Sequence, residues 1–178
     1  MKKALSVCEK YYPEEGTRVI DCKLALAEMY YCWRAAGREK VKKACSYFRE
    51  PFEVLRKKPE RQRHKPVERI AAMYSHSLTE LGATKDGEEI ARQSGLFFKQ
   101  FCIEDDPGFI KRLRIESSQD NTLQKYRRRV SGLELIRNTL DREKFVVTCV
   151  GTEDSVKAAF ELLREFVTTN RARYEQPL

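Results

Sequence analysis

The passage from residue 144 to residue 167 constrains the fold of this chain most. A β-branched and aromatic run over 144–150 predicts a strand. Gly151 then permits a sharp turn, and Thr152 stands where it can cap a helix whose first turn carries two acids, as a helix N-terminus prefers. Apolar residues recur at helical spacing over 153–167. We therefore expect a strand that leads directly into a capped helix and closes a small domain.

The chain has 178 residues, enough for one domain or two small ones. Its hydrophobic content of 41% and charged content of 35% are typical of a soluble globular protein. No apolar run approaches the roughly 20 residues of a membrane span, and the N-terminus has no signal-peptide core. We expect a cytoplasmic or nuclear protein without a membrane association.

The six cysteines never come closer than ten residues apart. No CxxC motif or Cys/His pairing occurs, so we expect no zinc or other metal site. At least four of the cysteines fall on apolar faces at helix or strand spacing. This pattern favours reduced core residues of an intracellular protein over a disulfide framework.

The net charge of +8 is unevenly placed along the chain. Residues 56–65 hold six basic residues and one acid, and residues 111–129 hold seven basic residues and two acids. Localised positive charge indicates a polyanionic partner, although such segments can also be solvated faces. The first segment would also suit a nuclear-import patch. The candidate RNA-contacting residues are Lys111, Arg112, Arg114, Lys125, Arg127, Arg128 and Arg129, with Arg56, Lys57, Lys58, Arg61 and Arg63 in the first segment.

The first ~95 residues predict helices over 3–11, 17–36, 39–48 and 67–81. We expect a short strand at 52–55, a basic loop at 56–65, a turn at 84–87 and one or two helical turns at 88–94. The apolar stripes of the N-terminal helices are expected to form the core. The stripe of the helix over 17–36 comprises Val19, Cys22, Leu26, Met29, Tyr30 and Trp33.

From Phe97 the pattern changes. It predicts a strand at 97–103, a helix from Pro107 to about Arg114, a loop at 115–121 and a helix at 122–130. A strand at 133–138 and a turn at 140–142 precede the final strand and helix. The fold class is therefore α+β, with a mainly helical N-terminal half followed by a β-α-α-β-β-α unit.

That order and size resemble a type I KH domain, an RNA- and single-stranded-DNA-binding fold. Residues 91–105, 124–133 and 150–157 resemble the entry, the second helix and the final strand-to-helix passage of the first classical KH domain of the fragile X family. The resemblance implies a KH-like domain over 90–173, preceded by a domain over 1–83.

Residues 32–44 and 69–76 resemble the variant KH-like domain that precedes the classical one in that family. The segment between them should then form strands, but residues 56–63 are poor strand formers. Residues 1–83 are therefore either all-helical or a second, eroded KH fold.

One departure from the KH pattern bears directly on function. KH domains grip the nucleic-acid backbone with a GxxG loop between their first two helices, where glycine lets backbone amides approach phosphates. At that place, residues 115–121 contain no glycine and two acids, Glu116 and Asp120. Either the domain binds nucleic acid through another face, or it serves as a protein-contact module.

No catalytic constellation is evident, and we expect no enzyme activity, cofactor or small-molecule substrate. The sequence has two histidines, of which His64 lies in the basic loop and His76 on a helix, and it has no GxSxG, P-loop, HExxH or dinucleotide motif. A lone histidine on such a helix is usually structural or exposed. Asp105 and Asp106 are interpreted as a helix-capping pair before Pro107.

Two functions remain open. The first is an RNA-associated regulatory module of a ribonucleoprotein, in which the basic residues contact phosphates of single-stranded RNA unless they are paired with Glu116, Asp120 and Glu134. The alternative is an interaction scaffold for a protein partner or a homodimer, using an exposed edge strand, the final helix or N-terminal aromatic residues. Those aromatic residues are Tyr30, Tyr31, Trp33, Tyr47 and Phe48, and a private core is their other interpretation.

Overall fold

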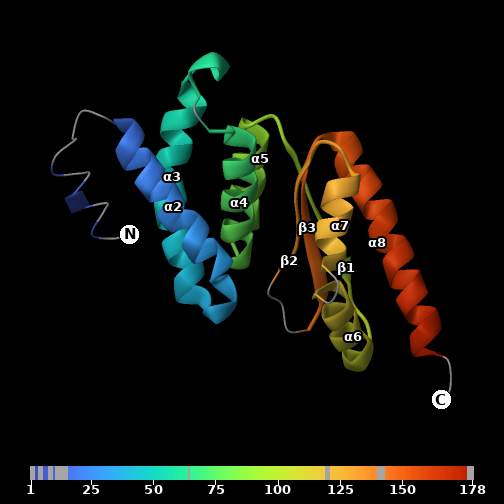
Figure 1. The fold of residues 1–178 in the computed structure, drawn as a ribbon. Coiled ribbons are helices and arrows are strands. Elements are labelled where there is room, and N and C mark those ends of the chain that lie inside the picture. The colour runs from blue at the N-terminus through green and yellow to red at the C-terminus, as the bar shows by residue number, and fades with distance from the viewer. Residues whose placement is uncertain are drawn as a thin grey trace. The chain divides into compact units, whose positions relative to one another are not determined.

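A computed structural model describes residues 16–63, 65–118, 121–139 and 143–175, together with residues 3, 6, 7 and 10. The helix predicted over 3–11 falls mostly outside these residues, and the turn predicted at 140–142 falls wholly outside them. The protein is an α+β protein that divides into two compact units, Met1–Ile90 and Ala91–Leu178 (Figure 1).

All described elements of the N-terminal unit are helical, in line with the mainly helical half that the sequence predicts. Four α-helices and two short 3₁₀ helices follow one another along the described chain (Figure 1). They are α2 (Gly16–Cys32), η1 (Arg34–Ala36), α3 (Arg38–Lys57), η2 (Glu60–Gln62), α4 (Val67–Glu80) and α5 (Thr84–Gln93).

Helix α3 is much longer than predicted. It continues through Pro51 to Lys57, so the predicted strand at 52–55 is wrong, and the predicted loop begins only after Arg56 and Lys57. The helix continues because its apolar face keeps helical spacing past the proline, as the buried residues Val41, Phe48 and Leu55 show. Burial of this face outweighs the backbone hydrogen bond that Pro51 cannot make.

Helix α2 ends earlier than predicted, at Cys32, and this changes the environment of Trp33. The buried face of α2 includes Ile20, Leu24, Ala27 and Tyr31 rather than the whole predicted stripe. Trp33 lies beyond the last helical turn and exposes 54% of its surface, so its assignment to the core is wrong.

Residues 84–87 form the first turn of α5 rather than a separate turn. Gly87 is needed there for close packing, because a Cβ at this position would lie 2.7 Å from the backbone oxygen of Ser75 in α4. The chain turns earlier, at Gly82, where φ is +90°. The amides of Gly82 and Ala83 donate to backbone oxygens in the last turn of α4, which ends the helix.

The C-terminal unit contains three strands and three helices in the order β-α-α-β-β-α. The strands form an antiparallel sheet of order β1-β3-β2, with a bulge between Leu133 and Leu135. The elements are β1 (Phe97–Ile103), α6 (Pro107–Ser118), α7 (Thr122–Arg129), β2 (Leu133–Asn138), β3 (Phe145–Gly151) and α8 (Glu153–Tyr174).

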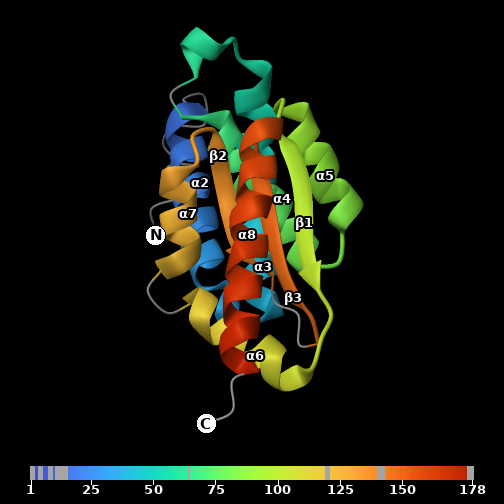
Figure 2. The ribbon, with the colours of Figure 1, turned by 90° about the vertical axis from the view of Figure 1, so that its right-hand side faces the viewer.

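The three helices cover one face of this sheet (Figures 1 and 2). Their core joins strand residues such as Phe145 and Val147 to Phe109 of α6, Leu123 of α7 and Leu163 of α8. Since β3 is central, β1 and β2 form the two edges of the described sheet. On β1, the Lys99 ammonium lies 5.3 Å from the ring centre of Phe160 in α8, which directs this charge toward the helix-covered face.

Helix α6 runs to Ser118, four residues beyond its predicted end, so residues 115–118 are not a loop. The prediction missed that Leu113 and Ser117 continue the buried face. At the other end, Asp106 caps the helix as predicted, accepting hydrogen bonds from the amides of Gly108 at 2.8 Å and Phe109 at 3.1 Å. The predicted cap of α8 is also present, since the Thr152 hydroxyl accepts from the Ser155 amide at 3.3 Å.

Candidate nucleic-acid interface

The basic residues of α7 occupy its outward side. Leu123 is buried and Tyr126 is partly buried against the core. These two contacts fix which side of the helix faces inward, and the basic residues lie mostly on the other side. Lys125, Arg128 and Arg129 are exposed, whereas Arg127 is half-buried. None of these four cations forms an ion pair or side-chain hydrogen bond with another described residue.

The basic residues of α6 differ from one another. Lys111 is exposed and has no partner among the described residues. Arg112 is half-buried, and its Nε atom is buried without a hydrogen-bond partner. Arg114 donates to the backbone oxygen of Lys144 at 2.7 Å, which ties α6 to the start of β3. Only Lys111 of these three is therefore fully available for a ligand.

The alternative interpretation, in which these cations pair with acidic neighbours, is not met among the described residues. Glu116 and Glu134 pair with none of the α6 and α7 cations, and Asp120 lies outside the described residues. The exposed cations Lys111, Lys125, Arg128 and Arg129 therefore keep their charge toward solvent. The chain enters α7 at Asn121, whose φ of 52° is left-handed, a conformation that asparagine tolerates better than most residues.

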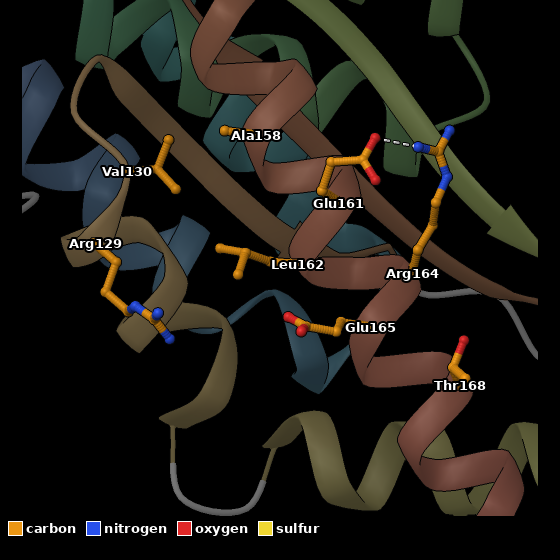
Figure 3. A pocket seen from close by; sticks show the side chains of 8 residues that line it. All are labelled: Arg129, Val130, Ala158, Glu161, Leu162, Arg164, Glu165 and Thr168. Atoms are coloured by element: carbon orange, nitrogen blue, oxygen red, sulfur yellow. Dashed lines mark hydrogen bonds and ion pairs between the residues drawn. The ribbon is translucent and has the colours of Figure 1, made fainter.

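A groove of about 640 Å³ lies between the C-terminal end of α7 and the outer side of α8 (Figure 3). Val130, Ala158 and Leu162 supply apolar surface, and Arg129 and Glu165 project from opposite walls. Burial raises the pKa of Tyr126, while Glu165 raises it further and Arg129 lowers it, which places both charges near this phenol.

The basic segment 56–65 is partly structural. The Arg56 guanidinium binds the Glu53 carboxylate through Nε at 3.0 Å and Nη2 at 2.7 Å. Arg63 donates to the backbone oxygens of Lys58 at 2.9 Å and Arg56 at 3.4 Å, which satisfies carbonyls at the end of α3. Lys57, Lys58 and Arg61 have no described side-chain partner and remain available, while His64 lies outside the described residues.

The sequence prediction missed a third basic segment. Residues 34–43 contain five cations and one acid, next to an exposed tryptophan. Trp33 contacts Tyr30 edge to face, and Tyr30 stacks on Tyr47. A charge count restricted to windows of ten residues would have found it. Of the aromatic residues predicted for an interface, Tyr30, Tyr31 and Phe48 are buried.

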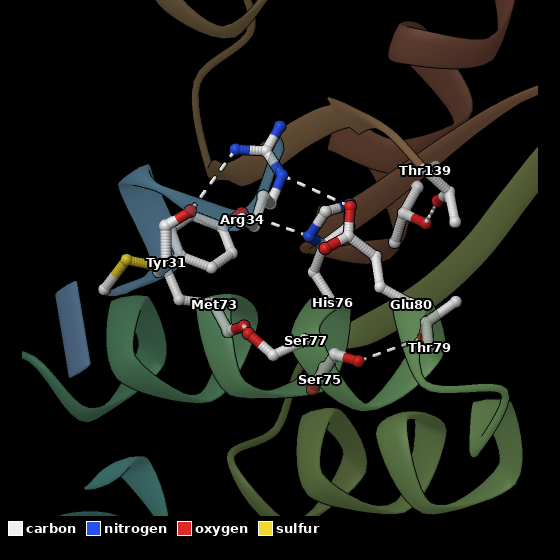
Figure 4. A network of polar contacts seen from close by, with 10 residues as sticks. Tyr31, Arg34, Met73, Ser75, His76, Ser77, Thr79, Glu80 and Thr139 are labelled. Atoms are coloured by element: carbon white, nitrogen blue, oxygen red, sulfur yellow. Dashed lines mark hydrogen bonds and ion pairs between the residues drawn. The ribbon is translucent and has the colours of Figure 1, made fainter. Parts of the chain in front are cut away.

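His76 is buried in a polar network of the N-terminal unit (Figure 4). Its Nδ1 atom lies 3.2 Å from the Tyr31 hydroxyl, and its Nε2 atom lies 3.8 Å from the Glu80 carboxylate. Arg34 donates to the same carboxylate at 3.2 Å. Because the Glu80 side chain is 1% exposed, its pairing with Arg34 offsets the cost of burying a charge. The network joins α2 and η1 to α4, which fits the structural role expected of His76.

Within the described residues, no helix is long and apolar enough to cross a membrane. The same residues contain no cluster of three or more His, Cys, Asp or Glu side chains that could hold a metal ion. Comparison of the chain with protein-family models, curated proteins and solved structures found no match.

Proposed function

We propose that this protein binds single-stranded RNA as a regulatory component of a ribonucleoprotein, through the basic side of α6 and α7. The observation that carries the proposal is the row of exposed cations Lys125, Arg128 and Arg129, none of which has a described acidic partner. Like charges three and four residues apart destabilise a helix by a few tenths of a kcal/mol per pair. A bound polyanion would remove that repulsion.

The helix macrodipole explains part of this arrangement. It favours cations in the last turn of α7, where Arg127, Arg128 and Arg129 lie. It does not account for Lys125, one turn earlier, or for Lys111 in the first half of α6. Recognition of phosphate groups would account for all of them.

We further propose that residues 90–173 are a KH-like domain. The support is the order of the described elements, β-α-α-β-β-α, which is the order that the sequence resemblance implies. Phosphates would be contacted by long basic side chains, because residues 115–121 offer no glycine for a close approach of backbone amides. Such contacts carry little sequence information, so we expect weak sequence specificity.

The test is a fluorescence-anisotropy titration of single-stranded RNA at ~50 and ~200 mM salt. We expect binding to weaken steeply with salt in the wild type. The triple variant Arg127→Ala, Arg128→Ala, Arg129→Ala should bind more weakly, and its slope of log K against log salt should be shallower by about 2, since each single-strand phosphate contact contributes about 0.7.

A matched control removes three cations from α8 instead, through Lys157→Ala, Arg164→Ala and Arg173→Ala. It lowers the net charge by the same amount and should leave the slope nearly unchanged. Equal slopes in the two variants would mean that net charge alone drives binding. Absence of binding by the wild type at ~50 mM salt would contradict the proposal and favour the scaffold function, for which the apolar floor of the α7–α8 groove is the candidate surface.

A further inference from the structure

A rigid aromatic support holds Trp33 at the surface of the N-terminal unit. The Tyr30 and Trp33 rings meet at 85° with centres 6.5 Å apart, and Tyr30 stacks on Tyr47 at 3° and 5.8 Å. Tyr30 is 5% exposed, whereas Trp33 is 54% exposed. The buried Tyr30 ring therefore supports the indole on one side, while much of the indole is open to solvent.

Two lysines of α3 lie beside these aromatic rings. The Lys40 ammonium lies 5.7 Å from the ring centres of both Trp33 and Tyr30, and the Lys43 ammonium lies 5.6 Å from that of Tyr30. Neither lysine forms a close ion pair with a described carboxylate, although the Lys43 charge helps to lower the pKa of Glu39 one turn earlier. We call Tyr30, Trp33, Lys40, Lys43 and Tyr47 the Trp33 patch.

The other cations nearby are already engaged. Lys42 pairs with Glu39 at 2.7 Å, Arg38 donates to the backbone oxygen of Leu81 at 2.9 Å, and Arg34 pairs with Glu80. Lys40 and Lys43 are therefore the charges that remain for a ligand. Lys40 lies in the first turn of α3, where the macrodipole disfavours a cation, so its charge does not serve the stability of the helix.

We propose that the Trp33 patch binds an unpaired base of a single-stranded nucleic acid, which stacks on the indole while Lys40 and Lys43 neutralise the flanking phosphates. An aromatic face beside cations that form no close ion pair matches a base joined to phosphates, and stacking accepts every base because each has a π face. The inference deepens the proposed function and takes its ligand class from it, but it uses different residues in the other unit.

Trp33 is the single tryptophan of the sequence, so tryptophan emission reports on this site alone. The experiment titrates the full chain with a short oligouridine and with an abasic oligomer of the same length at ~50 mM salt. Emission and the anisotropy of the labelled oligomer are followed together. We expect both oligomers to bind, and we expect oligouridine alone to quench the emission.

Three variants separate stacking from charge. Trp33→Leu should weaken oligouridine binding roughly 5- to 150-fold and leave abasic binding unchanged. Trp33→Phe should restore most of the affinity. Lys40→Ala with Lys43→Ala should make the salt slope shallower by about 1.4 for both oligomers. Because Trp33 is exposed, its substitution should leave the circular dichroism spectrum and melting temperature unchanged.

The outcomes distinguish this inference from the proposed function. Binding of oligouridine without quenching would overturn the stacking site and leave the α6–α7 contact in place. Quenching that persists unchanged in the Arg127, Arg128, Arg129 triple alanine variant, with an unaltered salt slope, would support the stacking site and contradict the α7 contact. Absence of binding to either oligomer overturns both. A blue shift of emission with protein concentration alone would overturn the inference in favour of self-association.

Discussion

Glycine is required at position 151 because neighbouring atoms leave no room for a side chain, and not because the chain turns there. Its backbone continues β3 and pairs with Phe97 on one side and Leu133 on the other. A Cβ at this position would lie 2.5 Å from the Gly132 backbone oxygen and 2.5 Å from the Ser155 hydroxyl. The sequence correctly marks the glycine, but the reason for it lies in a contact between residues far apart in the chain.

Gly151→Ala should lower the free energy of unfolding by about 3 kcal/mol, because the backbone of β2 must move to admit a methyl group. Urea denaturation measures this. Gly95→Ala is the control, since Gly95 has a φ of +70° but no atom within 4 Å of a Cβ, and it should cost only about 1 kcal/mol. An unfolding midpoint for Gly151→Ala at or above that of the control would contradict the steric argument.

At the scale of elements, one carboxylate joins the start of α6 to the end of α8. Besides capping α6, the Asp106 carboxylate accepts from the Tyr174 hydroxyl at 2.9 Å. The same ends also meet through the ion pair of Arg171 with Asp105 and through the Arg171 guanidinium, 4.0 Å from the Phe109 ring centre. These contacts fix the long C-terminal half of α8 to the first turn of α6.

This junction should depend on pH. The hydrogen bond from Tyr174, with those from the Phe109 and Gly108 amides, lowers the pKa of Asp106 below its ordinary value. Its stabilisation is therefore complete above the unfolded pKa of about 3.9 and is lost as the pH falls through the lower folded pKa. Wild type should melt a few degrees above Asp106→Asn at pH 7, and the difference should shrink below about pH 4.

Tyr174→Phe supplies the control for that comparison. It removes the largest cause of the pKa shift, so Asp106→Asn should lower the melting temperature less in the Tyr174→Phe protein than in the wild type. A melting-temperature gap between wild type and Asp106→Asn that stays constant from pH 7 to about pH 2 would show that the carboxylate charge contributes nothing.

Elements with a regular local pattern could be predicted from the sequence, and those set by distant contacts could not. The strand at 133–138 and the cap of α8 at Thr152 were predicted correctly. The continuation of α3 through Pro51 was not, because local propensity places a stop there and only the buried face beyond it overrules the proline. The first turn of α5 was missed because a glycine locally indicates a turn, whereas Gly87 lies in a helix and allows close packing.

At the scale of the whole molecule, the candidate interface could be predicted only in part. The sequence indicates that the arginines of α7 face outward, because Leu123 and Tyr126 fix the inner side of the helix. It cannot indicate that Arg63 closes the end of α3, since that role depends on the path of the backbone. It left Trp33 open between the core and an interface, and the core assignment failed because the predicted helix extended past its true end.

The described cysteines likewise divide by environment: Cys45 and Cys149 are buried, Cys22 is partly buried, and Cys32 and Cys102 are exposed. Among the described residues, each unit contains one buried thiol, Cys45 or Cys149, and burial raises the pKa of each to about 12. The reactive thiolate is thus almost absent near neutral pH.

Iodoacetamide at pH 8 should therefore modify Cys32 in the native protein and leave Cys45 and Cys149 unmodified, as peptide mass spectrometry would show. Labelling in urea provides the control, since all three thiols should then react. Modification of Cys45 or Cys149 at a rate comparable to that of Cys32 under native conditions would contradict the described cores.

The sheet of the C-terminal unit has consequences for how separate molecules behave at high concentration. A three-stranded sheet presents backbone donors and acceptors along β1, and an added strand from another molecule could pair with them. Such a strand would extend the apolar face and enclose the Lys99 ammonium, which leans toward Phe160. Dehydrating that charge without a carboxylate partner opposes the addition. A single lysine thus opposes fibre-like growth by strand addition at this edge.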